Sequence, residues 1–146
     1  MGLIKQNGAS DIYLLNVDYD YVGVDEDSPE DFEFKIHDDY KIDGFNEDIV
    51  GITFTRKVYY DPEMFFNISV KLRLICLINK EEEKELNKAN LERELKEKEK
   101  SLLSPVVSRA SLLIANITNT DDDLDIITHP FCKGMKKSLF KTINSK

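Results

Sequence analysis

The sequence predicts an α+β fold, in which a four-stranded antiparallel sheet is followed by one or two helices packed on one face. Four segments of the first half alternate apolar and polar residues, and a later segment repeats its apolar residues with the period of a helix. The alternating segments are residues 12–22, 32–42, 49–60 and 65–78. Because such alternation gives each strand one buried and one wet face, we expect an antiparallel sheet covered on one side.

The apolar sets of these segments define the expected buried face. They are Tyr13, Leu15, Val17, Tyr19 and Tyr21 in the first segment, Phe32, Phe34, Ile36, Tyr40 and Ile42 in the second, Ile52, Phe54, Val58 and Tyr60 in the third, and Phe66, Ile68, Val70, Leu72, Leu74, Cys76 and Ile78 in the fourth. Between the last two segments, Asp61-Pro62-Glu63 has the composition of a turn. The third and fourth strands are therefore predicted to form a hairpin.

The region after the strands divides into a charged part and an apolar helix. Residues 79–100 hold eight acids and seven bases, a pattern typical of a charged helix or connector. Residues 101–118 are predicted to be a helix, with Ser104 as N-cap and Pro105 at the first helical position. One stripe of this helix is apolar. A second stripe consists of the small residues Ser104, Ser108, Ser111 and Ala115, and together with Leu112 beside it this stripe is expected to form an oligomer interface.

Length and charge restrict the possible functions. The 146 residues suit a single domain spanning 1–146, and the net charge of -8 argues against a nucleic-acid partner. No signal segment and no run of 18 apolar residues is visible, so we expect a cytoplasmic protein without a membrane span. Residues 133–146, with five lysines and no acid, are expected to form a basic, mobile tail.

No catalytic, metal or cofactor motif emerges. The segment that begins at Asp18 starts like a calcium loop, but Val22 and Pro29 occupy positions that need oxygen ligands. His129 and Cys132, even with His37, fall short of a zinc site with matched spacing. Phosphate loops and nucleophile elbows are also missing from the sequence. We therefore expect no enzyme activity, no catalytic residues, no metal and no cofactor.

Apolar residues on the polar face of the fourth strand point to binding. Phe65, Ile75 and Leu77 lie on that otherwise polar face, and the helix adds its second stripe. Exposed apolar surface of this extent usually marks an interface. Either an oligomer or a bound ligand could cover it.

The order of the elements resembles the SecB-like chaperone family. Four antiparallel strands precede Leu102-Leu103-Ser104-Pro105-Val106-Val107-Ser108-Arg109-Ala110-Ser111-Leu112-Leu113-Ile114-Ala115-Asn116-Ile117-Thr118, which is followed by Ile126-Ile127-Thr128-His129-Pro130-Phe131. The resemblance spans about residues 10–132. It departs from the family at the helix start, where the Phe-Pro-Tyr element is replaced by Ser104-Pro105-Val106-Val107, and at the double proline, replaced by His129-Pro130. These departures argue against docking to the SecA translocase.

The resemblance implies a chaperone that holds unfolded or preprotein clients without ATP and assembles as a homodimer or homotetramer. Clients of such proteins lie in apolar grooves between helix and sheet. The residues expected to bind them here are Phe54, Val58, Phe65, Phe66, Ile75, Leu77, Ile126 and Phe131. The alternatives are a dedicated protein-interaction module, such as a toxin–antitoxin support chaperone, and a phage-type accessory oligomer.

Overall fold

A computed structural model of the chain describes residues 2–5, 11–23 and 31–118. It confirms the predicted fold class, because four antiparallel strands are followed by two α-helices. The strands are β1 (Asp11–Gly23), β2 (Glu33–Phe45), β3 (Ile49–Asp61) and β4 (Phe65–Leu77). Each begins and ends within three residues of the range predicted from alternation.

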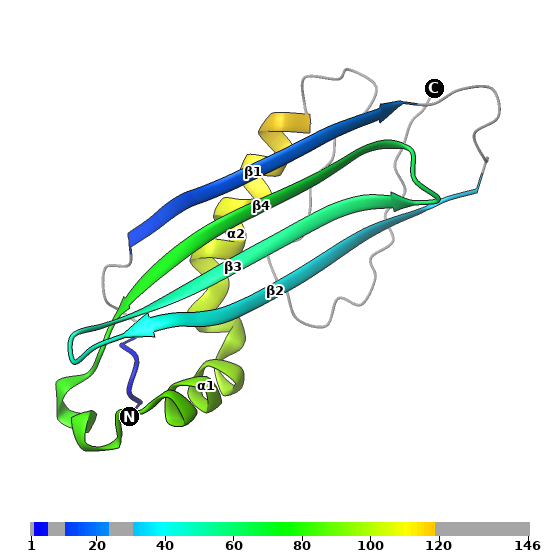
Figure 1. Cartoon of the computed structure of the whole chain (residues 1–146). Coiled ribbons are helices and arrows are strands. Elements are labelled where there is room, and N and C mark those ends of the chain that lie inside the picture. Colours follow the sequence, from blue (N-terminus) through cyan, green and yellow to red (C-terminus); the bar gives the residue numbers. More distant parts are fainter. Residues whose placement is uncertain (1, 6–10, 24–30, 119–146) are drawn as a thin grey trace.

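The strand order in the sheet is β1-β4-β3-β2 (Figure 1). Strands β2, β3 and β4 follow one another as hairpins, and β1 lies antiparallel to β4. This is a Greek-key order, with the first strand placed beside the last. Strands β1 and β2 are therefore the two edges of the sheet, a relationship that alternation alone does not predict.

The hairpin predicted at residues 61–63 is confirmed. Pro62 follows a cis peptide bond at Asp61, and the Glu63 carboxylate accepts a hydrogen bond of 2.7 Å from the Asn67 amide. At the turn between β2 and β3, the side-chain oxygen of Asn46 accepts hydrogen bonds from the backbone N–H groups of Asp48 (2.7 Å) and Ile49 (2.9 Å). Asparagine favours turns because its side chain can satisfy nearby backbone donors in this way.

The charged segment after β4 is helical. It contains the 3₁₀-helix η1 (Lys80–Glu85) and helix α1 (Lys88–Glu97), whose N-cap is Asn87. Helix α2 (Glu99–Thr118) follows after a single residue. The prediction of Ser104 as N-cap is wrong, because Leu102 N–H already bonds to the Lys98 carbonyl and Pro105 lies inside the helix on its exposed side.

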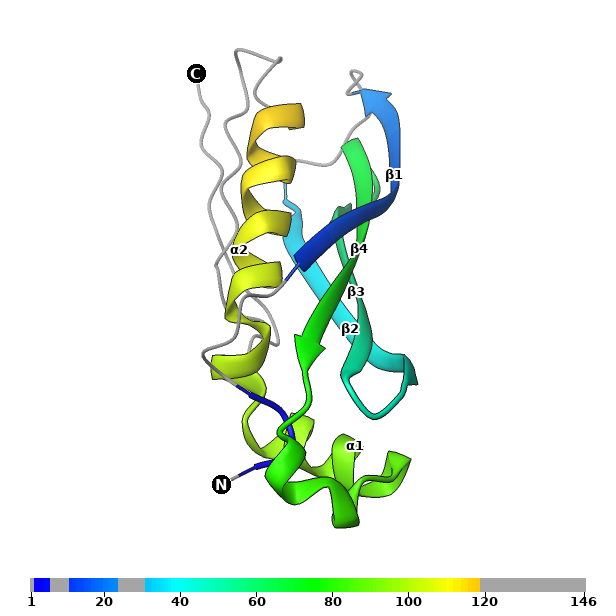
Figure 2. The same cartoon turned by 90° about the vertical axis from the view of Figure 1, so that its left-hand side faces the viewer.

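One face of the sheet packs against α2. Figure 2 shows the sheet and α2 as two layers, with no labelled element on the other side of the sheet. The helix packs on β4 and, less extensively, on β3. By length and composition α2 could also cross a membrane. Its apolar residues instead belong to the core of this fold, where Val106, Val107, Ala110 and Ile114 are buried.

A bulge in β1 changes which of its residues share a face. Leu14 pairs with Leu72, but Asn16 pairs with Lys71, so Leu15 is an extra residue on the β1 side. One extra residue reverses the direction of every side chain beyond it. As a result Tyr13 lies on the outer face of the sheet, although the alternation grouped it with Val17. The helix-side face of β1 consists of Ile12, Leu14, Val17, Tyr19 and Tyr21.

Candidate polypeptide-binding surface

The largest group of exposed apolar side chains lies on β1. Leu14, on the helix-side face, is 53% exposed, and Tyr21, on the same face, is 73% exposed. Val17 is half-buried between them, and Tyr19 stacks on the buried Phe66 at a ring-centroid distance of 5.9 Å. We call Leu14, Val17, Tyr19 and Tyr21 the β1 apolar row.

The helix layer covers the β1 apolar row only in part. The residues on β4 that pair with this row, which include Leu72, Val70 and Phe66, are all buried. Helix α2 packs mainly on β4 and also passes behind β1 (Figure 1), where Val17 is half-buried, whereas Leu14 and Tyr21 on either side of Val17 stay exposed. An edge strand also presents backbone N–H and C=O groups that point away from its single neighbour. In the part of the chain that the structure describes, β1 therefore combines an edge with no neighbouring strand and a partly open apolar face.

The outer face of β1 is acidic. Asp18 and Asp20 pair with Ser69 and Asn67 on the side of the sheet opposite α2. Both aspartates are exposed, and neither forms an ion pair in the part of the chain that the structure describes. They line a shallow depression of about 770 Å³ that extends across the sheet to Lys57 and His37. Beyond the bulge at Leu15, the two faces of β1 thus differ sharply in chemistry.

A buried ion pair joins the sheet to the helix. The Arg56 guanidinium on β3 is 0% exposed and donates hydrogen bonds of 2.7 and 2.8 Å to the Asp38 carboxylate on β2. Its third nitrogen donates to the Ser111 hydroxyl on α2 at 2.9 Å. A buried guanidinium needs such partners, because an unpaired charge in the core is strongly unfavourable.

The sequence carries a pattern that indicates this ion pair. Each of the two apolar sets skips one position, at Asp38 in the second segment and at Arg56 in the third. The register places these two residues directly opposite each other, and their charges are opposite. A pair of matched gaps with complementary charges on adjacent strands predicts a buried salt bridge.

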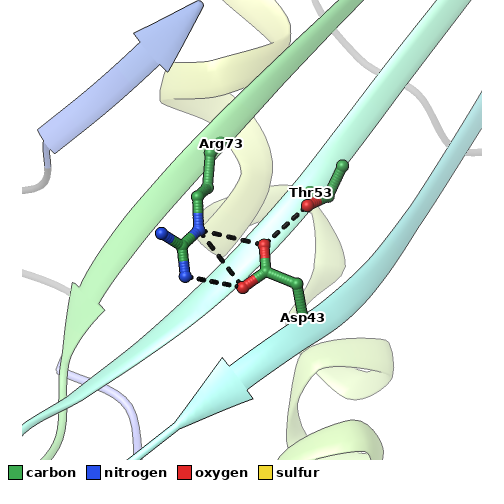
Figure 3. Close-up of polar contacts among 3 residues, drawn as sticks. All are labelled: Asp43, Thr53 and Arg73. Carbon is green, nitrogen blue, oxygen red and sulfur yellow. Dashed lines mark hydrogen bonds and ion pairs between the residues drawn. The ribbon is translucent and has the colours of Figure 1, made fainter. Parts of the chain in front are cut away.

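A second ion pair crosses the outer face (Figure 3). Arg73 on β4 reaches over β3 and donates three hydrogen bonds of 2.8–3.2 Å to Asp43 on β2, which also accepts one of 2.6 Å from Thr53. Burial acts to raise the pKa of Asp43, but the hydrogen bonds from Arg73 and Thr53 and the Arg73 charge outweigh it and hold that pKa below 3.8. Gly51 leaves space for this contact, because a Cβ there would lie 2.6 Å from both Arg73 and Asp43.

Several residues expected to bind clients belong to the core instead. Phe54, Val58 and Phe66 are buried on the helix-side face, so a client could reach them only if the core opened. Phe65 and Ile75 are half-buried, and Leu77 is exposed. Phe65 packs edge-on against Phe32 and Tyr60. Ile126 and Phe131 lie outside the described residues.

The residues expected at an oligomer interface divide in a similar way. Leu112 is 60% exposed, and Ser104, Ser108 and Ala115 are half-buried on α2. Ser111 is a correction to the expected interface, because it is buried and accepts the hydrogen bond from Arg56. Its small side chain thus serves the contact between α2 and the chain's own sheet.

The described residues hold no metal site. They contain no group of three or more His, Cys, Asp or Glu side chains arranged to hold a metal ion. His129 and Cys132 lie outside them. The Tyr60 hydroxyl is buried and has no hydrogen-bond partner among the described residues, and burial raises the pKa of this phenol, so it stays protonated.

Comparisons with known proteins give no family for this chain. No protein-family model and no curated protein matches it. Among solved structures, a protein of unknown function from Streptococcus agalactiae is 13% identical, with a TM-score of 0.42. The match covers 84% of this chain and 99% of that one. A likeness at this level does not bear on function.

Proposed function

We propose that the protein is an ATP-independent holdase that binds unfolded polypeptides along β1. The observation that carries the proposal is the β1 apolar row, which α2 leaves open on the edge of the sheet. An extended polypeptide that covers such a row gains roughly 25 cal/mol for each Å² of apolar surface removed from water. The net charge of -8 would help to keep a loaded complex in solution.

Strand β1 suits an unfolded client better than a folded one. A strand laid beside an open edge forms main-chain hydrogen bonds that do not depend on its sequence, which is a known mode of peptide recognition. Such binding needs no nucleotide, because the client supplies the extended strand. The resemblance to the SecB-like family, in which clients are held without ATP, agrees with this role. Self-association through the exposed side of α2 at Leu112 belongs to the same proposal.

The test is suppression of aggregation. A chemically unfolded protein is diluted into buffer with increasing amounts of this protein and without nucleotide, and light scattering is followed. We expect scattering to fall for several unrelated unfolded proteins. Unchanged scattering at a large molar excess of the holdase would reject the proposal. Protection of one protein alone would favour the dedicated interaction module instead.

A further inference from the structure

We propose that β1 selects extended client segments in which apolar and basic residues alternate. This inference rests on the proposed function and specifies the chemistry of its client. It follows from the different chemistry of the two faces of β1. Leu14 and Tyr21 are exposed on the helix side, and Asp18 and Asp20 are exposed on the outer side.

The geometry of a sheet converts this difference into a sequence pattern. A client strand beside β1 points successive side chains to opposite faces, because the side-chain period of a strand is two. Side chains directly opposite on two antiparallel strands lie about 5 Å apart at Cβ. One set of client side chains would therefore meet the β1 apolar row, and the alternate set would meet Asp18 and Asp20.

The spacing of the two aspartates favours a repeated basic residue. Asp18 and Asp20 are two positions apart on the same face, so they match Lys or Arg side chains two positions apart on a client strand. Asp20 has no hydrogen bond or ion pair in the described part of the chain, and Asp18 accepts a single hydrogen bond from Asn16. Their carboxylates are thus available to a cation from outside.

Charge argues against a second copy of the chain as the occupant of this edge. Two β1 strands related by a two-fold axis perpendicular to the sheet would place four aspartates, two from each copy, on the same outer face. Like charges placed opposite each other in a sheet are destabilising. A basic client segment would instead neutralise these aspartates. Charge complementarity therefore favours a basic client over a second copy of the chain.

The experiment compares fluorescent peptides of equal length by anisotropy. One peptide alternates valine and lysine, a second carries the same residues in two blocks, and a third alternates valine and glutamate. We expect the Val–Lys alternating peptide to bind most tightly and the Val–Glu peptide to bind least. Equal affinity of the alternating and block peptides would overturn the inference, because composition alone would then explain binding.

Matched variants locate the contact. Asp18→Asn and Asp20→Asn should each weaken binding of the Val–Lys peptide by about 1.5- to 5-fold, the range for one cross-strand charge pair. Asp39→Asn removes the same charge from the outer face of β2, the other edge of the sheet, and should leave the affinity unchanged. Equal losses in all three variants would mean general attraction to an acidic protein and would contradict the inference.

Two further results separate the possible failures. If an unfolded protein binds but the two valine–lysine peptides bind equally, the holdase function stands and only the pattern is wrong. If no peptide binds and light scattering reports a dimer that Tyr21→Asp separates, β1 is a contact between copies, and the inference is wrong. Hydrogen exchange provides a direct check, since a bound strand should protect amides of β1.

Discussion

Asp38 and Arg56 face each other on adjacent strands and form a bidentate ion pair inside an otherwise apolar layer. Arg56 also reaches α2 through Ser111, so a single guanidinium connects two strands and the helix. Its partners on β2 and α2 fix how the helix sits on the sheet. Because the pair is buried, its two members should be costly to remove separately.

Removal of one partner should destabilise the fold far more than removal of both. We expect Arg56→Met to lower the free energy of unfolding by about 3–5 kcal/mol, because it leaves the Asp38 carboxylate buried without its partner. The double variant Asp38→Leu with Arg56→Met should recover most of that loss. Urea denaturation of the single and double variants measures both quantities. Losses that simply add would show that the two residues do not act as a pair.

Gly51 should be required beneath the Arg73–Asp43 ion pair. A Cβ at Gly51 would collide with both side chains, whereas nothing lies within 4 Å of a Cβ at Gly44. We expect Gly51→Ala to destabilise the fold by about 1 kcal/mol, the upper end for an exposed ion pair. Gly44→Ala should be neutral or slightly stabilising, since alanine restricts the unfolded chain. Thermal unfolding of the two variants tests the difference, and equal melting temperatures would contradict it.

The same ion pair should make part of the stability depend on pH. Since the pKa of Asp43 in the folded protein lies below its ordinary value of 3.8, its contribution is complete above that value. The contribution is lost as the pH falls through the folded pKa. Asp43→Asn should therefore reduce stability by less than about 1 kcal/mol at pH 7, and the difference from the parent protein should shrink below pH 3.8. Denaturation across this range, with Asp39→Asn as control, measures it.

Glu94 should hold the N-terminal segment against α1. Its carboxylate accepts hydrogen bonds from the backbone N–H groups of Leu3 (2.7 Å) and Ile4 (2.9 Å), two residues whose side chains are buried. We expect Glu94→Ala to cost roughly 1–3 kcal/mol, the range for part-buried donors that lose a charged acceptor. Hydrogen exchange at these two amides should accelerate. Glu92→Ala, on the exposed side of the same helix, should change neither measurement.

The fold class could be predicted because burial on one face imposes a period of two on each strand. The sets on β3 and β4 coincide with buried residues from Ile52 to Tyr60 and from Phe66 to Ile78. The strand order could not be predicted in this way, because alternation says nothing about neighbours. The bulge at Leu15 was also hidden, since Leu15 and Tyr13 are both apolar and a one-residue shift leaves the pattern plausible.

Which apolar residues are exposed was predicted less well, for a related reason. Phe54, Val58 and Phe66 are large apolar residues, and sequence alone does not separate a core residue from one in an open groove. What decides is the path of α2, which packs mainly on β4 and leaves Leu14 and Tyr21 exposed on β1. That coverage depends on the crossing of α2 over the sheet, which no local pattern encodes.

The affinity of the protein for an unfolded client, measured with and without the β1 apolar row, tests the central claim most directly. The double variant Leu14→Ser with Tyr21→Ser removes two exposed side chains of the row, and Phe45→Ser removes an exposed aromatic from β2 as a control. If a client covers the row, the double variant should bind a labelled unfolded protein at least about tenfold more weakly, since each half-exposed side chain contributes about 1 kcal/mol. The Phe45→Ser variant should bind like the parent protein. Unchanged affinity in a folded double variant would contradict the account.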